Sequence, residues 1–430
     1  MTAPLTAFLS GEPLGEFSFG NGQATFDYSE DTAQDSTPLS LSMPRSRQHH
    51  GNRPVSAFLK GLLPDNQAAL ANMARGAGTS PNSLQGLLGA YGRDVAGALQ
   101  ILPTGEPSDD STPGNLDTSP LLDHDSFERL VATTRQAYSS PVPAQNAFRF
   151  SVAGAQPKLA LSMNSAGQWI QPTRDIATTH LIKPLTHDVT GGVAEMEILE
   201  QITMRSARSL GLDAPQIQLW TSERTGQQAL IVPRYDRKIV GNHVVRIHQE
   251  DLCQALAIPP EKKYQHRDSG PGVGAIARLF ADRAPRQRHE LGVAFFRLLV
   301  FNLGILGTDA HAKNYSLFLD GRDVAMTPLY DSISAAAHAT QVQNTGDLTF
   351  PMSISGEYKF DSISPQGLLR EGKRLGLDTT AAENIMNDLL PRIPAAMTTA
   401  AEELHRADLA QMLSDGLSRL SLSRHFTGHV

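Results

Sequence analysis

One segment, residues 295–334 (FFRLLVFNLGILGTDAHAKNYSLFLDGRDVAMTPLYDSIS), constrains the fold of this chain more than any other. It begins with a nearly all-apolar run that extends to Gly304 and Gly307, and such a run predicts a helix buried on every side. A polar loop follows, and two alternating runs joined by the turn DGRD (residues 320–323) then predict a β-hairpin. We therefore expect the loop to be held rigidly between a buried helix and a hairpin.

The polar loop carries Asp309 and, five residues later, Asn314. This is the spacing of a kinase catalytic loop, in which the aspartate accepts the proton of the substrate hydroxyl and the asparagine binds magnesium. Asp331 ends the second strand of the predicted hairpin, so its carboxylate could return beside Asn314. Because Mg²⁺ prefers carboxylate and amide oxygens, the three side chains together predict a phosphoryl-transfer site.

Each of these residues also has a simpler interpretation. Asp309 could cap a helix, Asn314 could fill a turn, and Asp331 could lie in a solvated loop. Asp309 and His311 could instead belong to a metal site, although the 14 histidines of the chain show no HExxH pattern. Otherwise His311 would orient the loop or contact a phosphate.

Candidate nucleotide-binding residues lie upstream of this loop. The small residues of SVAGAQPK (151–158) would let backbone N–H groups approach a phosphate closely, or they form an ordinary β-turn. Lys183 lies at the end of the strand-like run THLIK, where kinases place the lysine that pairs with the α- and β-phosphates, or it is a solvated strand-end lysine. Glu200, on the next predicted helix, is its candidate partner, with Glu195 and Glu197 as competitors.

Residues 229–237 (ALIVPRYDR) predict a strand that ends near Pro233, which cannot donate a ladder hydrogen bond. In a kinase they would form the hinge between the lobes, where backbone groups of residues 232–235 could bind adenine. In the simpler interpretation they are an edge strand that ends at a turn.

Shifts in composition divide the chain into four parts. Residues 1–104 mix strand-like runs with a helical stretch at residues 54–74 and predict a small α+β domain. Residues 105–146 predict a linker that carries one helix. Residues 147–236 predict a lobe built on antiparallel sheet, and residues 237–430 predict a mostly helical lobe.

Charge and composition argue against several classes of protein. The net charge of −7 disfavours broad binding to nucleic acid by this chain alone. The N-terminus has no basic segment before an apolar run, and no apolar stretch reaches about 18 residues, so neither secretion nor a membrane span is expected. The single cysteine, Cys253, fits a reducing cytoplasm and is expected to be a small buried side chain.

Taken in order, the motifs resemble those of the HipA family, the kinase toxins of bacterial toxin–antitoxin pairs. LSLSMP, FLKGLLPDN and LLGAYGRDVAGALQILP resemble the N-terminal domain of the family, and SVAGAQPK, FNLGILGTDAHAKNYSL and PLYD resemble its kinase core. The resemblance runs over nearly the whole chain. It implies an α+β, protein-kinase-like fold with an antiparallel-sheet N-lobe, a mostly helical C-lobe and an extra small N-terminal subdomain.

The resemblance also implies roles for individual residues. Asp309 would be the catalytic base, and Asn314 and Asp331 would bind Mg²⁺. Lys183 would bind phosphate, and Ser151 would be autophosphorylated, which should expel the neighbouring loop and silence the enzyme. ATP would contact Val152, Ala153, Gly154, Ala155, Gln156, Pro157, Lys183, Val232, Pro233, Arg234, Tyr235, His311, Lys313, Asn314 and Asp331. The chain departs from the family at Pro157 and Pro233, where relatives more often carry glutamate.

Partners follow from the same resemblance. Family members phosphorylate translation proteins, in known cases aminoacyl-tRNA synthetases, and a small DNA-binding HipB-type antitoxin restrains them, so any DNA contact would be indirect. Two other functions stay open: a non-catalytic kinase-shaped scaffold in an antitoxin–DNA repressor complex, and a small-molecule kinase related to aminoglycoside phosphotransferases. Asp309, Asn314 and Asp331 favour an active kinase over the scaffold, and the N-terminal motifs count against the small-molecule kinase.

Overall fold

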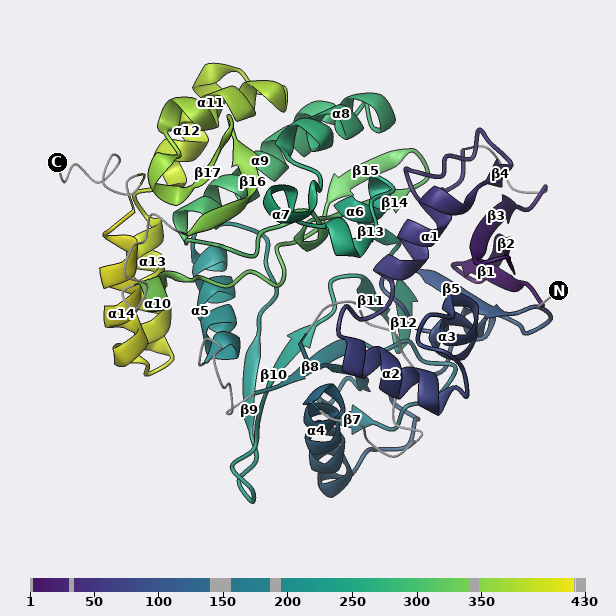
Figure 1. Ribbon diagram of the computed structural model, residues 1–430. Helices are drawn as coiled ribbons and strands as arrows, with labels where there is room; N and C mark the ends of the chain where they lie inside the picture. The colour runs from purple at the N-terminus through teal and green to yellow at the C-terminus, as the bar shows by residue number, and fades with distance from the viewer. Residues whose placement is uncertain are drawn as a thin grey trace. The chain divides into compact units, whose positions relative to one another are not determined.

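Helices and antiparallel sheets are divided between two units in the computed structural model (Figure 1). The structure describes residues 3–30, 35–139, 156–185, 195–339, 348–420 and 422. The first unit comprises Met1–Thr186, Gln218–Glu261 and Phe318–Arg322, and the second comprises His187–Ile217, Lys262–Leu317 and Asp323–Val430. Within the described residues, none of the helices is both long enough and apolar enough to cross a membrane.

The N-terminal part of the first unit is a five-stranded antiparallel sheet covered by helices. The strand order is β4-β3-β2-β1-β5. The strands are β1 (Leu5–Leu9), β2 (Glu12–Gly20), β3 (Gln23–Tyr28), β4 (His49–His50) and β5 (Leu99–Pro103), and the helices are α1 (Asn52–Gly61), α2 (Gln67–Gly76) and α3 (Leu84–Tyr91). Buried residues alternate along β3, so one face of the sheet packs on the core.

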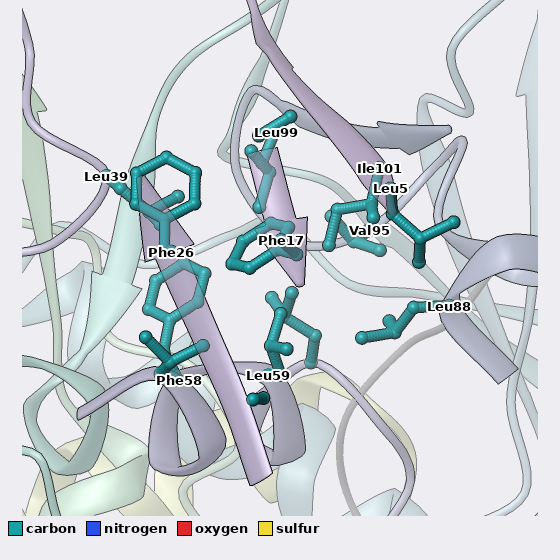
Figure 2. Close-up of a cluster of buried hydrophobic side chains, with 14 of the residues drawn as sticks. Leu5, Phe17, Phe26, Leu39, Phe58, Leu59, Leu88, Val95, Leu99 and Ile101 are labelled. Carbon is teal, nitrogen blue, oxygen red and sulfur yellow. The ribbon is translucent and has the colours of Figure 1, made fainter. Parts of the chain in front are cut away.

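Figure 2 shows that core, where apolar side chains from the sheet meet side chains from the helices. Phe17 and Phe26 project from β2 and β3, and their ring centroids lie 4.8 Å apart. Phe58 of α1 and Leu88 of α3 belong to the same buried cluster. This N-terminal part of the first unit therefore has a hydrophobic core of its own.

The helical stretch predicted at residues 54–74 is two helices, and the prediction of one continuous helix is wrong. Pro64 breaks the stretch, because proline lacks an N–H and disfavours helical geometry in the residue before it. Asn66 then caps α2, since its side chain accepts a hydrogen bond from a backbone N–H of the first turn at 2.9 Å.

A second antiparallel sheet in the first unit has the order β7-β6-β8-β10-β9. Its strands are β6 (Leu159–Met163), β7 (Trp169–Ile170), β8 (His180–Pro184), β9 (Gln218–Thr221) and β10 (Gln228–Pro233). Helix α4 (His124–Ser139) packs on this sheet through Phe127 and Val131. Strand β10 pairs with β8 from Ala229 to Pro233, but its pairing with β9 stops at Ile231, so Val232 and Pro233 extend past the end of β9.

The rest of the first unit consists of short elements. They are β11 (Arg237–Val240), β12 (His243–Arg246), β13 (Gln249–Asp251), α6 (Leu252–Ala255) and the 3₁₀ turn η1 (Asp109–Ser111), with η2 (Pro260–Lys262) at the end of the unit. Cys253 lies in α6 and is buried, as expected.

The second unit is mostly helical. Its helices are α5 (Met196–Ser209), α7 (Gln265–Asp268), α8 (Val273–Arg283), α9 (Arg288–Gly304), α10 (Ala336–Ala339), α11 (Pro365–Arg374), α12 (Thr379–Leu389), α13 (Ile393–Glu403) and α14 (Ala407–Leu417), with the 3₁₀ turns η3 (Ala312–Asn314) and η5 (Phe360–Ser362). Strands β16 (Thr349–Ile354) and β17 (Glu357–Lys359) form a hairpin. Helices α13 and α14, in yellow, pack against each other (Figure 1).

Helix α9 is the buried helix predicted from the apolar run. Phe295, Phe296 and Phe301 are fully buried. Its last residue, Gly304, lies so close to α13 that a Cβ atom would be 2.4 Å from Cδ1 of Ile393, so a larger residue there would require that side chain to move. The expected hairpin also forms: β14 (Ser316–Asp320) and β15 (Asp323–Met326) are neighbours in one sheet.

Candidate active site

Asp309, Asn314 and Asp331 lie together in the second unit, where they line one pocket. The side-chain Nδ2 of Asn314 donates to the backbone carbonyl of Asp309 at 2.8 Å and to that of Asp331 at 3.4 Å. Asn314 therefore ties the loop after α9 to the segment after β15. The convergence expected from the helix, loop and hairpin is present.

The loop between α9 and β14 is closed by its own backbone. His311 N–H donates to the Asp309 carbonyl at 2.8 Å, and Asn314 N–H donates to the His311 carbonyl at 2.9 Å. The N-cap residue of η3 is His311. Asp309 does not cap this helix, because its carboxylate points elsewhere and accepts a hydrogen bond from the hydroxyl of Tyr264.

Asp331 has left-handed backbone geometry, with φ of +52°. Aspartate is one of the few residues other than glycine that adopt this geometry readily. The next residue, Ser332, anchors the segment, because its Oγ donates to Oδ1 of Asn302 at 2.6 Å. The direction of the chain at Asp331 is thus fixed by contacts on its C-terminal side as well as by Asn314.

Asn302 is a site residue that the sequence reasoning missed. It lies in α9 and is 3% exposed. Its Nδ2 donates to the Leu298 carbonyl at 3.0 Å and to the Tyr315 hydroxyl at 3.1 Å, while its Oδ1 accepts from Ser332. Tyr315 follows Asn314 and Ser332 follows Asp331, so one buried amide positions both residues. The available signal was a lone amide in an apolar run, because a buried amide needs hydrogen-bond partners.

Tyr264 is the second residue that was missed. The hydroxyl of Tyr264 donates a hydrogen bond to Asp309. The guanidinium of Arg267 lies 3.8 Å from the centroid of the Tyr264 ring, and the ring of His311 meets the Tyr264 ring edge-on, with the two centroids 4.7 Å apart. Tyr264 lies 45 positions before Asp309, so no spacing rule connects the two residues.

The Asp309 carboxylate combines solvent access with a raised pKa. Its side chain is 60% exposed. Surrounding protein atoms exclude part of the water around Asp309, and this desolvation raises the pKa of Asp309 above its ordinary value. The hydrogen bond from Tyr264 lowers that pKa, and the nearby Asp331 carboxylate raises it further. A raised pKa makes this carboxylate a stronger proton acceptor than an ordinary aspartate.

His311 is buried and neutral. It is 2% exposed, and burial lowers its pKa to about 3. Its Nε2 lies 3.7 Å from Oδ1 of Asp309, but a neutral ring forms no ion pair there. Across the described part of the chain, no group of three or more histidine, cysteine or acidic side chains could hold a metal ion.

Two family models cover this chain. Residues 150–397, more than half of the chain, match the HipA-like C-terminal domain, and residues 5–102 match the HipA N-terminal domain. The chain belongs to the HipA family.

Relatives of this HipA-family chain match it over most of its length. It is 34% identical over 379 residues to the protein Y4mE of Sinorhizobium fredii, covering 87% of this chain and 82% of that protein. It is 29% identical over 411 residues to the serine/threonine-protein kinase toxin HipA of Shewanella oneidensis, covering 92% of this chain and 89% of that protein. The structure of the Shewanella oneidensis HipA, HipB and operator DNA complex matches with a TM-score of 0.76 and 25% identity, over 99% of this chain and 97% of that chain. The expected α+β, protein-kinase-like fold is confirmed.

The nucleotide-loop residues of the HipA-family chain are described only in part. Ser151, Val152, Ala153, Gly154 and Ala155 lie outside the described residues. Gln156 and Pro157 are half-buried and lead into β6. Their contact with a nucleotide stays a prediction.

The predicted Lys183–Glu200 pair is divided between the two units. Lys183 lies on β8 and is 4% exposed, and Glu200 lies on α5 and is 1% exposed. Lys183 belongs to the first unit and Glu200 to the second, so their pairing stays a prediction. Of the competitors, Glu195 forms an ion pair with Arg406 at 2.6 Å.

In the predicted hinge, the side chain of Arg234 makes hydrogen bonds within the protein. Its guanidinium is buried and bonds Asp236 at 2.8 Å and Thr178 at 2.9 Å. Its backbone N–H donates to the Thr179 carbonyl at 2.9 Å. Any contact of Arg234 with a nucleotide would therefore involve its carbonyl group.

The remaining predicted ligands have well-defined surroundings. The hydroxyl of Tyr235 donates to Gln249 at 3.1 Å, and Val232 and Pro233 lie at the end of β10. Lys313 is buried in η3, and its carbonyl accepts from the Tyr330 hydroxyl at 2.8 Å. Their roles in ATP binding stay predictions.

Proposed function

We propose that this HipA-family chain is an ATP- and Mg²⁺-dependent serine/threonine protein kinase of the toxin type, with Asp309 as its catalytic base. One observation carries the proposal: the Asn314 amide joins the backbone of Asp309 to that of Asp331, so a proton acceptor and two oxygen ligands share one pocket. Phosphoryl transfer requires little from a protein beyond positioning and charge neutralisation: Asp309 would position the substrate hydroxyl, and Asn314 and Asp331 would hold the Mg²⁺ that neutralises the phosphate charge.

The donor set fits magnesium. Because Nδ2 of Asn314 makes the two backbone contacts, Oδ1 is the atom of Asn314 that would bind the metal, beside the Asp331 carboxylate. Both are hard oxygen ligands, and Mg²⁺ takes one or two such ligands and completes its shell with phosphate oxygens and water. When bound, Mg²⁺–ATP supplies the phosphoryl group and the neutralising positive charge.

The Asp309 carboxylate would orient the substrate hydroxyl and accept its proton. Its side chain is open to solvent, so a serine or threonine of another protein can reach it. Its raised pKa supports the transfer of that proton. The buried Asn302 network keeps the two metal ligands in place during this step.

The substrate, regulation and partners are part of the same proposal. We infer that the protein substrate is a translation protein, an aminoacyl-tRNA synthetase, and that autophosphorylation of Ser151 inactivates the enzyme. A HipB-type antitoxin is the expected partner, because the matched Shewanella oneidensis structure contains HipA, HipB and operator DNA. DNA would be contacted through that antitoxin.

Phosphoproteomics of cells that express the wild type or Asp309→Asn tests this function and identifies the substrate. We expect growth arrest and new phosphoserine or phosphothreonine sites, including Ser151, in the wild type only. Asp320→Asn, in the exposed hairpin turn, is the matched control and should behave as the wild type. Growth arrest without new phosphorylation that persists in Asp309→Asn would instead support the scaffold function.

A further inference from the structure

The segment between η2 and α8 brings the ring of Tyr264 against the candidate base. We propose that Tyr264 is a positioning residue for Asp309: its hydroxyl holds one carboxylate oxygen so that the other faces the substrate hydroxyl. This inference deepens the proposed function and rests on Asp309 being the base. It assigns a role to a residue outside the catalytic loop.

The hydrogen bond has a defined direction. An ionised carboxylate only accepts, so the Tyr264 hydroxyl donates and Oδ1 of Asp309 accepts. Burial raises the pKa of Tyr264, and the Asp309 charge adds to this, so the hydroxyl keeps its proton. With Oδ1 engaged and the side chain 60% exposed, Oδ2 is the oxygen left for a substrate.

The Tyr264 ring is held by two further contacts. The Arg267 guanidinium lies 3.8 Å from the ring centroid, which is cation–π geometry. The buried His311 ring meets it edge-on at 4.7 Å, with an interplanar angle of 89°. Since His311 belongs to the candidate catalytic loop, this contact packs the Tyr264 ring directly against that loop.

The backbone of Tyr264 is also fixed. Its carbonyl accepts hydrogen bonds from Asp268 N–H at 3.1 Å and Gly270 N–H at 3.0 Å. At Gly270 a Cβ atom would lie 2.1 Å from the Lys262 carbonyl oxygen, so the chain closes tightly there. The neighbouring Gln265 accepts from the backbone N–H of Ser353 in β16 at 2.8 Å. A residue fixed this way suits positioning and does not suit a gate that must swing open.

Tyr264→Phe tests the inference, because it removes the hydroxyl and keeps the ring between Arg267 and His311. We expect kcat to fall roughly tenfold or more while KM for ATP changes less than about twofold, since misplacing a catalytic group mainly affects the chemical step. Tyr358→Phe is the matched control: that half-buried ring packs on His266 at 4.8 Å in the same unit, and its loss of a hydroxyl should leave both constants unchanged.

A readout without turnover separates this inference from the proposed function. In protein labelled with 3-fluorotyrosine, the ¹⁹F resonance that is missing from Tyr264→Phe identifies Tyr264 among the 8 tyrosines. That resonance should shift in Asp309→Asn and stay in place in Asp320→Asn. An unshifted resonance would overturn the contact between Tyr264 and Asp309. An unchanged or increased kcat in Tyr264→Phe would overturn the positioning role, and an increase would indicate that the tyrosine blocks the base. Full activity of Asp309→Asn would refute the proposed function, whatever the resonance does.

Discussion

Asn302 holds the residues beside both candidate metal ligands, and its contribution to stability can be measured. In Asn302→Ala the buried hydroxyls of Tyr315 and Ser332 lose their partner, and an unsatisfied buried polar group costs about 1–3 kcal/mol. We expect the free energy of unfolding in urea to fall by roughly 2–3 kcal/mol. Asn384→Ala, at an exposed position of α12, is the control and should change it by less than about 0.5 kcal/mol. Equal effects of the two substitutions would contradict this role.

Glu250, far from the active-site loop in sequence, is a buried acid whose protonation should set the pH dependence of stability. It is fully buried, and burial raises its pKa from 4.5 to about 8, although the backbone N–H of Leu41 donates to it at 2.8 Å. Between these two values the folded state binds more protons than the unfolded state, so stability falls as pH rises, by roughly 1.4 kcal/mol per pH unit at most.

Glu250→Gln keeps an acceptor for Leu41 and removes the titration. We expect thermal or urea unfolding of this variant to lose less stability between pH 5 and pH 8 than the wild type does, while the exposed Glu16→Gln follows the wild type. Parallel curves for Glu250→Gln and wild type would show that Glu250 does not hold its proton in the folded state.

At the scale of elements, a buried ionic network connects the segment after α3 to the segment after β10. Asp94 accepts from Arg237 at 2.6 Å and from the Thr178 N–H at 3.0 Å, and Arg234 lies 3.4 Å from it. Asp94→Asn would remove the negative charge that faces the buried guanidinium groups of Arg234 and Arg237. We therefore expect the free energy of unfolding to fall by roughly 3–5 kcal/mol. Asp27→Asn, an exposed aspartate on β3, should cost far less, and a similar loss in both variants would refute the network's role.

The spacing of apolar residues and the turn sequence predicted the helix and the hairpin on either side of the active-site loop. The apolar run before Gly304 predicted α9 because the residues from Leu298 to Gly304 are buried on all sides of the helix, and the DGRD turn predicted the hairpin because Gly321 adopts φ of +57° there. Apolar spacing alone does not predict the break between α1 and α2, because the helical spacing continues on both sides of Pro64 and Asn66.

At the scale of the whole molecule, the contacts that sequence spacing does not determine are those between distant segments. Asp309 and Asn314 could be found because the loop fixes their spacing, and Asp331 because a hairpin returns the chain. Tyr264 meets Asp309 and Glu250 meets Leu41 only through the tertiary fold, since 45 and 209 positions separate these pairs. The domain boundaries and the nucleotide ligands stay predictions.

The proposed kinase function depends most on Asp309 as the catalytic base. The most direct measurement is the transfer of labelled phosphate from ATP, in the presence of Mg²⁺, to the purified full-length chain and to added cell extract. We predict incorporation by the wild type and by Asp320→Asn, and a loss of at least roughly 100-fold in Asp309→Asn at unchanged folding stability. Undiminished incorporation by Asp309→Asn would show that Asp309 is not the catalytic base.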